Sequence, residues 1–231
     1  MKLSTVQFIN KHSQVFVSSS KKIRETNLSI EEIIVDHTPS LVATLKESDL
    51  IIKCIRARSW HEYIKLLWNH SRVSKEIHGS VLLEQLGLSV PKIYQVGIGI
   101  IPSRNYQFIG YYVMKNLHST GFQELSKLIN SNEIDTEIRT KAMKAIYSGL
   151  KKMKEAQIVF SDFHLDNIFT NTAGEIVWID TGVTTYTKIN IKKFYSKYNH
   201  SIHRYINYEY KGNNLLSKTE QSMFKKLLIS S

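Results

Sequence analysis

Two neighbouring stretches decide the fold of this chain: FSDFHLDNIF at residues 160–169 and EIVWIDTG at residues 175–182. An apolar pair at 168–169, a turn at 171–174 that contains Asn and Gly, and an apolar run at 176–179 predict a β-hairpin. Asp162 and Asn167 lie ahead of this hairpin, and Asp180 follows it. The pattern therefore predicts that three polar side chains stand around one buried hairpin.

A loop with an Asp and an Asn, followed by a hairpin that ends in Asp-x-Gly, is typical of a phosphoryl-transfer site. Magnesium prefers carboxylate and amide oxygens together with phosphate, so Asn167 and Asp180 are the candidate metal ligands. Asp162 is the candidate catalytic residue, because a carboxylate there would accept the proton of an acceptor hydroxyl or orient that hydroxyl. Each motif is common by itself, but here their order and spacing are those of a phosphoryl-transfer site.

The chain ahead of this site predicts a β-rich segment. Residues 1–58 contain no glycine and read as an antiparallel sheet with strands at 6–9, 15–17, 28–35, 41–45 and 50–55. Lys53 is a lone charge in the last of these strands, where it either faces solvent or reaches a phosphate. Residues 60–86 are predicted to be helical, with Gly87 at the position that closes the helix. Glu76 on this helix is the candidate anionic partner of Lys53.

Further strands are predicted at 92–98 and 106–114, and the loop at 115–121 marks the predicted domain boundary. Residues 1–116 would form a β-rich nucleotide-binding lobe with one main helix, and residues 117–231 a mainly helical catalytic lobe. Met114, at the end of the last strand, is the candidate for backbone contact with a nucleotide base. Helices are predicted at 122–129, at 136–156 with Asp135 as N-cap, at 192–210 and at 218–228. The expected class is α+β.

Composition limits the alternatives. The single cysteine, Cys54, excludes a disulfide framework and reads as a small buried strand residue. Neither a signal peptide nor an apolar run of the ~20 residues that a membrane span needs is visible, so a cytoplasmic protein is expected. The net charge is +11, and from Lys188 onward nine bases minus two acids give +7. Such a segment attracts nucleic acid, phosphorylated sugars or an anionic membrane surface, or is simply a solvated basic face.

The sequence resembles the protein-kinase-like fold over roughly residues 40–185, and within it the bacterial lipopolysaccharide core kinases, which comprise the heptose and Kdo kinases. The resemblance rests on Ser71–Glu76, on Leu86–Pro91, on the Asp162-x₄-Asn167 loop and on Asp180-x-Gly182. The family pattern has His or Tyr where this chain has Phe160. It also has a glycine-rich loop before the lysine, for which the turn at 36–40 would have to substitute here.

The resemblance implies a two-lobed kinase fold that uses ATP and Mg²⁺ to phosphorylate a hydroxyl of the lipopolysaccharide inner core, with heptose first and Kdo next. It implies Asp162 as catalytic aspartate, Asn167 and Asp180 as metal ligands, Lys53 and Glu76 as an ion pair that holds the phosphates, and Met114 at the hinge. It also implies work at the cytoplasmic face of the inner membrane, where the basic C-terminal segment could contact anionic lipid.

Three alternatives stay open. Aminoglycoside and choline kinases share the Asp-x₄-Asn and Asp-x-Gly motifs. A pseudokinase or anionic-ligand binding module is compatible with Phe160 and with the missing glycines. A zinc or iron site would arise if Asp162, His164 and Asp166 alternated along one strand face. A nucleic-acid-binding role has no motif behind it and is not expected.

Overall fold

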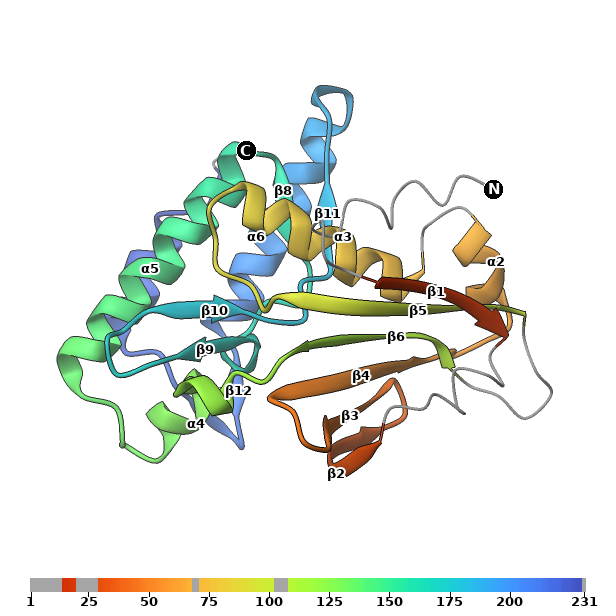
Figure 1. Ribbon diagram of the computed structural model, residues 1–231. Helices are drawn as coiled ribbons and strands as arrows, with labels where there is room; N and C mark the ends of the chain where they lie inside the picture. The colour runs from red at the N-terminus through yellow and green to blue at the C-terminus, as the bar shows by residue number, and fades with distance from the viewer. Residues whose placement is uncertain (1–13, 20–28, 68–70, 102–107, 230–231) are drawn as a thin grey trace. The chain divides into compact units, whose positions relative to one another are not determined.

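The computed structural model describes residues 14–19, 29–67, 71–101 and 108–229. The chain divides into two compact units: the first takes in the chain up to Val81 and Pro91–Ser119, and the second takes in Leu82–Val90 and the chain from Thr120 on. The α+β class is confirmed, because a sheet forms most of the first unit and helices with small sheets form the second (Figure 1). The strand predicted at 6–9 lies outside the described residues.

A six-stranded sheet with the order β1-β5-β6-β4-β3-β2 organises the first unit. Its strands are β1 (Gln14–Ser19), β2 (Ile30–His37), β3 (Ser40–Leu45), β4 (Leu50–Arg56), β5 (Ile93–Ile101) and β6 (Phe108–Lys115). The five strands from β5 to β2 are antiparallel neighbours, as predicted. The prediction is wrong for β1, which pairs in parallel with β5. Parallel neighbours need a long crossover, and here the chain from β2 to α3 provides it.

The two faces of the sheet bury different sets of side chains, because neighbouring residues of a strand point to opposite faces. Ile55 of β4 and Tyr112 of β6 pack with Val73 and Ile77 of α3 (Arg72–Gln85). Ile52 and Cys54 of β4 pack on the other face with Ala43, Tyr111 and Val113. Burial raises the pKa of the Cys54 thiol to about 12, so the reading of this cysteine as a buried strand residue is confirmed.

Helices α2 (His61–Leu67) and α3 form within the stretch predicted to be helical at 60–86. The end of α3 is closed as the sequence predicts. Gly87 has φ of +68°, its N–H donates to the Glu84 carbonyl at 2.9 Å, and the Leu88 N–H donates to the Leu83 carbonyl at 3.0 Å. These are the two hydrogen bonds of a Schellman motif, which satisfies the last carbonyls of a helix.

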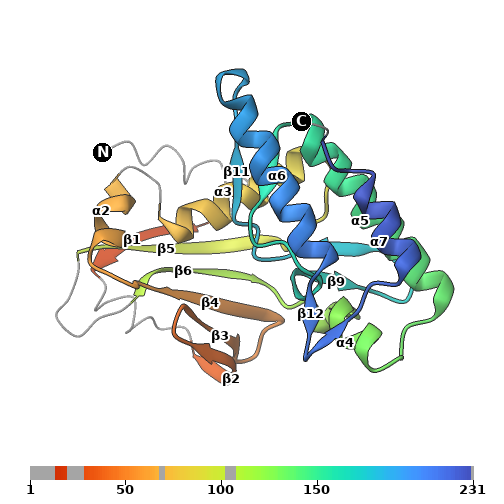
Figure 2. The same cartoon turned by 180° about the vertical axis from the view of Figure 1, so that it is seen from behind.

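Four helices form the frame of the second unit: α4 (Leu125–Asn130), α5 (Thr136–Glu155), α6 (Ile191–Ile206) and α7 (Lys218–Lys225). Asp135 caps α5 as predicted, accepting hydrogen bonds from the N–H groups of Glu137 and Ile138. Ser217 and Glu220 form a capping box at the start of α7. Figure 2 shows α6 and α7 from the side on which they are in full view, and the Tyr205 ring of α6 meets the Phe224 ring of α7 edge-on, with ring centroids 4.7 Å apart.

Short strands between these helices form three small sheets, with the orders β10-β9-β7, β11-β8 and β12-β13. The strands are β7 (Gln123–Glu124), β8 (Ile158–Phe160), β9 (Ile168–Thr170), β10 (Ile176–Trp178), β11 (Val183–Thr185), β12 (Glu209–Tyr210) and β13 (Asn213–Asn214). Among the described residues, 3₁₀ turns occur at η2 (His118–Thr120), η3 (Leu165–Asn167) and η4 (Lys188–Asn190). The predicted hairpin is confirmed as β9 and β10, which pair antiparallel with Ile176 opposite Thr170 and Trp178 opposite Ile168.

The indole of Trp178 is among the largest fully buried side chains and belongs to the core of the second unit. Its ring centroid lies 5.3 Å from that of Phe163 and 6.2 Å from that of Phe160. Helix α5 passes so close that a Cβ at Gly149 would meet the indole at 2.6 Å.

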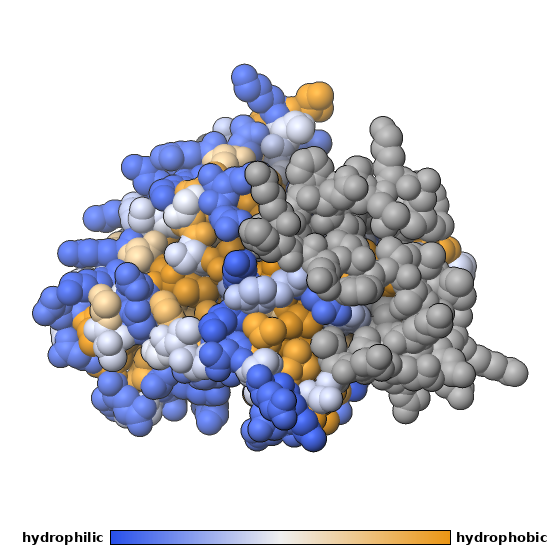
Figure 3. Space-filling view, viewed as in Figure 1, coloured by the Kyte–Doolittle hydropathy of each residue, from blue (hydrophilic) through white to orange (hydrophobic). Residues whose placement is uncertain are grey.

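In the view of Figure 3, hydrophilic side chains cover most of the visible face of this unit, with apolar side chains showing between them. In the described part of the chain, no helix is both long and apolar enough to cross a membrane.

Candidate functional site

The loop that carries Asp162 is held between two buried aromatic side chains. Phe160 ends β8, Phe163 follows two residues after the loop begins, and both rings are fully buried, 5.7 Å apart. The Phe163 ring also stacks on Tyr205, at 4.4 Å. The side chain of Asp162 between them is 72% exposed. The backbone is therefore fixed by packing while the carboxylate faces solvent, which is the arrangement that a reacting group needs.

Asn167 lies buried at the end of η3 and is tied back to this loop. Its Nδ2 donates to the Asp162 carbonyl oxygen at 2.8 Å and lies 3.3 Å from His164 Nε2. Because Nδ2 makes these two contacts, the amide oxygen Oδ1 is not the atom that ties the side chain to the loop. An amide oxygen is a ligand that Mg²⁺ accepts.

The hairpin register brings Asp180 to the same end of the hairpin as Asn167. The Ile179 N–H donates to the Asn167 carbonyl at 3.0 Å, which extends the β9–β10 pairing by one step, and Asp180 is the next residue. Asp180 has φ of +52°, a left-handed conformation that Asp tolerates better than most residues. Its carbonyl accepts from the Gly182 N–H at 2.7 Å in a tight turn. The structure thus brings Asp162, Asn167 and Asp180 together around one loop and one hairpin end.

Helix α6 braces this loop from the C-terminal part of the chain. Ser201 donates from its Oγ to the Phe160 carbonyl at 2.6 Å. Arg204 donates from Nη1 to the Ser161 carbonyl at 3.0 Å and from Nη2 to Asp162 Oδ1 at 2.8 Å. Sequence reasoning missed both residues, because no local pattern links a helix to a loop about forty residues earlier.

A second group of side chains, His164, Asp166 and Tyr208, contacts Asn167 through His164. The Tyr208 ring stacks on His164 with centroids 4.9 Å apart, and its hydroxyl donates to Asp166 Oδ2. His164 Nδ1 lies 3.6 Å from the same oxygen. Burial raises the pKa of the Tyr208 phenol, and the hydrogen bond to Asp166 raises it further. Since His164 Nε2 accepts from Asn167, a neutral His164 carries its proton on Nδ1, facing Asp166.

In the first unit, Lys53 and Glu76 form a buried ion pair. Lys53 Nζ lies 3.0 Å from Glu76 Oε2, with side-chain exposures of 5% and 11%. The Tyr112 hydroxyl donates to the same carboxylate oxygen at 2.8 Å. This contact is the expected ion pair between strand and helix, whereas its role toward a nucleotide stays a prediction. A buried ion pair contributes little net folding stability, because removing the two charges from water costs about as much as their attraction returns. Folding stability alone therefore does not explain this pair.

The remaining predicted positions of the first unit are found as follows. Met114 is buried inside β6, paired with Ile51 of β4 and Ile93 of β5, and the strand ends one residue later. Its contact with a nucleotide base stays a prediction. The turn at 36–40 is a tight hairpin turn, in which His37 pairs with Ser40. Arg72 Nη1 donates to the Pro39 carbonyl of this turn at 3.2 Å.

The zinc or iron alternative is contradicted. Asp162, His164 and Asp166 do not alternate along a strand, because β8 ends at Phe160 and a 3₁₀ turn begins at Leu165. Within the described residues, no group of three or more His, Cys, Asp or Glu side chains is placed to hold a metal ion. Asn167 and Asp180 offer a different set of donors, an amide oxygen and a carboxylate. Such oxygens suit magnesium, which takes its remaining ligands from phosphate and water.

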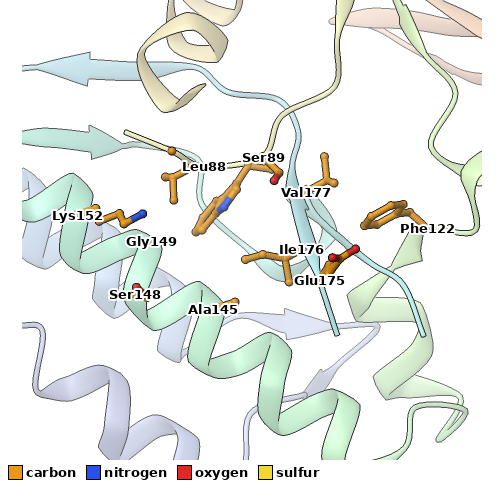
Figure 4. A pocket seen from close by; sticks show the side chains of 12 residues that line it. Leu88, Ser89, Phe122, Ala145, Ser148, Gly149, Lys152, Glu175, Ile176 and Val177 are labelled. Atoms are coloured by element: carbon orange, nitrogen blue, oxygen red, sulfur yellow. The ribbon is translucent and has the colours of Figure 1, made fainter. Parts of the chain in front are cut away.

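A cavity of about 370 Å³ in the second unit lies elsewhere than the predicted site residues. Figure 4 shows it between α5, which carries Ala145, Ser148 and Lys152, and the strand that carries Ile176 and Val177. Lys152 Nζ donates to the Leu86 carbonyl at 3.2 Å. None of Asp162, Asn167 and Asp180 lines this cavity, so it is not the predicted phosphoryl-transfer site.

Comparison with protein-family models and with curated proteins finds no match to the sequence.

Proposed function

We propose that the chain is an ATP-dependent phosphotransferase that acts on an alcohol hydroxyl. The observation that carries the proposal is the orientation of Asn167. Its Nδ2 is held by the Asp162 carbonyl at 2.8 Å, and its own carbonyl accepts from Ile179, next to Asp180. One residue thereby links the backbone of the candidate catalytic aspartate to the residue that precedes the candidate metal ligand Asp180. Such a link is expected in a site where metal-bound phosphate must meet an acceptor hydroxyl in line.

Each side chain has a defined role in this proposal. Asp162 orients the acceptor hydroxyl and takes its proton, a contribution of about 10²–10⁴ in rate. Asn167 Oδ1 and the Asp180 carboxylate would hold Mg²⁺, which when bound neutralises the charge of the transferred phosphoryl group. Lys53, kept in place by Glu76, holds the nucleotide phosphates, and the backbone at Met114 contacts the base. The two-lobed protein-kinase-like arrangement is part of the same proposal.

The proposed acceptor is a sugar of the lipopolysaccharide inner core, heptose first and Kdo next, phosphorylated at the cytoplasmic face of the inner membrane. Support comes from the resemblance of Ser71–Glu76 and Leu86–Pro91 to the core kinases. In the structure, Glu76 of the first segment reaches Lys53, and Gly87 of the second closes α3. The net +7 from Lys188 onward suits an anionic acceptor.

A second candidate function is a pseudokinase that binds an anionic ligand without phosphoryl transfer. One observation favours it: Arg204 is paired with the carboxylate that a kinase would use as base. In that case Arg204 would leave Asp162 and bind the ligand's anionic group, and no phosphate would be transferred.

The test is ATP turnover with Mg²⁺ and a dephosphorylated lipopolysaccharide core, for the natural chain, Asp162→Ala and Asp162→Asn. Asp135→Ala is the matched control, because Asp135 is an aspartate of the same unit that only caps α5. We expect phosphate incorporation that both Asp162 variants lose and the control keeps. Binding of the core without incorporation would establish the second candidate, and incorporation into an aminoglycoside or choline alone would reassign the acceptor.

A further inference from the structure

Ile189 is an apolar residue that is almost fully exposed. It stands in η4, directly ahead of α6, and 94% of its surface is exposed. The turn between β11 and α6 extends away from the other helices of the second unit in both views (Figures 1 and 2). A single exposed apolar residue is ordinary on a protein surface, so its neighbours decide whether it has a use.

The charged residues near Ile189 in the sequence are all basic. From Thr181 to Tyr208 the chain contains no Asp or Glu, and it contains five Lys and Arg residues. All five side chains are exposed, at Lys188, Lys192, Lys193, Lys197 and Arg204.

Helix α6 sorts its side chains by face. The buried face is apolar and packs in the core of the second unit through Phe194, Tyr198, Ile202 and Tyr205. On the outer face, Lys193, Lys197, His200 and Arg204 follow one another at helical spacing and form a stripe about 16 Å long.

We propose that α6 and η4 form a docking surface for an anionic lipid bilayer, with the basic face of α6 along the headgroups and Ile189 inserted among them. An exposed apolar residue at the end of a basic face adds apolar burial to the electrostatic attraction between that face and an anionic membrane surface. The charge complements an anionic leaflet. The apolar tip distinguishes a bilayer from nucleic acid, which offers phosphates but no apolar layer for Ile189 to enter.

This surface is connected to the candidate site. The stripe ends at Arg204, whose guanidinium holds Ser161 and Asp162. A docked α6 would therefore bring Asp162 toward acceptors held at the membrane. This consequence rests on the proposed function, whereas docking itself does not.

The docking surface is tested by co-sedimentation with vesicles of phosphatidylcholine, with and without about one third phosphatidylglycerol. We expect binding to the anionic vesicles only, and we expect salt to weaken it. The triple change of Lys192, Lys193 and Lys197 to Gln should lower the partition coefficient by about fivefold per lysine. Ile189→Ser should lower it several-fold, and Ile189→Leu should preserve it.

The matched control changes Lys46, Lys75 and Lys92 to Gln, three exposed lysines of the first unit, so that net charge falls equally. Equal losses in the control and the α6 variant would overturn the proposal, since binding would then reflect net charge alone. Ile189→Ser with unchanged binding would overturn the insertion of the tip. RNA that binds through the α6 lysines, with no vesicle binding, would replace the bilayer as partner. Vesicle binding needs no ATP, so its failure leaves the phosphotransferase proposal untouched.

Discussion

Arg204 Nη2 lies 2.8 Å from Asp162 Oδ1, and the same guanidinium donates through Nη1 to the Ser161 carbonyl at 3.0 Å. The fork of an arginine thus fixes both the backbone and the carboxylate of the candidate catalytic loop. Both side chains are largely exposed, at 47% for Arg204 and 72% for Asp162. This contact therefore positions the loop, and it adds little to folding stability.

Replacing Arg204 with Gln should separate these two effects. We expect the free energy of unfolding to change by less than about 1 kcal/mol, as for other exposed ion pairs. Turnover of ATP with acceptor should fall by about tenfold or more, because Asp162 loses its orientation. Urea unfolding and steady-state kinetics measure the two quantities. Arg204→Lys should recover only part of the activity, since an ammonium cannot reproduce the fork. Full activity in Arg204→Gln would contradict the positioning role.

Replacing Tyr208 with Phe removes one hydrogen bond and keeps the ring that stacks on His164. Asp166 Oδ2 then loses its hydroxyl donor in a partly buried place, which should cost about 1–3 kcal/mol of unfolding free energy. His164 and Asn167 should lose their fixed orientation, so half-maximal turnover should need more Mg²⁺. A Mg²⁺ titration of turnover measures this. Tyr210→Phe, two residues further on, is the control and should leave the titration unchanged.

Replacing both members of the Lys53–Glu76 ion pair should show whether the pair serves folding stability or ATP binding. Lys53→Met alone removes the Lys53 cation from beside the buried Glu76 carboxylate, and we expect a loss of about 3–5 kcal/mol. The double variant Lys53→Met with Glu76→Gln leaves no buried charge and keeps an acceptor for the Tyr112 hydroxyl, so it should regain most of the stability. Neither variant should bind ATP. Unfolding curves and ATP titration measure both outcomes, and tight ATP binding by the double variant would refute the phosphate-holding role.

Glu220 should make stability depend on pH in the acid range. Burial by itself would raise the pKa of Glu220, but hydrogen bonds from Arg139 and Ser217 outweigh it and lower the pKa from its ordinary value of 4.5. A lowered pKa in the folded state means that the carboxylate stabilises the fold above about pH 4.5. This contribution is lost as the pH falls through the lowered pKa.

The measurement compares the natural chain with Glu220→Gln in urea unfolding at several pH values. The natural chain should be the more stable at pH 7, and the difference should shrink steadily below about pH 4.5. A difference that is independent of pH would show that the Arg139–Glu220 contact contributes through packing alone.

The sequence by itself determined the local elements. The turn at 171–174, which contains Asn and Gly and lies between apolar runs, was enough to predict the β9–β10 hairpin. Asp135 was enough to predict the start of α5, and Gly87 was enough to predict the end of α3. These features depend on backbone conformations and caps that a few neighbouring residues decide. The sequence left Lys53 either facing solvent or reaching a phosphate, with Glu76 as its candidate partner, and the structure shows it buried and paired with Glu76.

Only the tertiary structure decided which distant residues meet. The parallel pairing of β1 with β5 depends on where the chain returns after a long crossover, and no local pattern encodes that. Ser201, Arg204 and Tyr208 reach the loop that carries Asp162 because the apolar face of α6 packs beside β8, which aims the polar side chains near its end at backbone carbonyls and carboxylates there. From the sequence those residues read as part of a basic tail. Their contacts with Phe160, Asp162 and Asp166 arise from packing across about forty residues of chain, and a hydrogen bond over that separation exists only once both elements are folded.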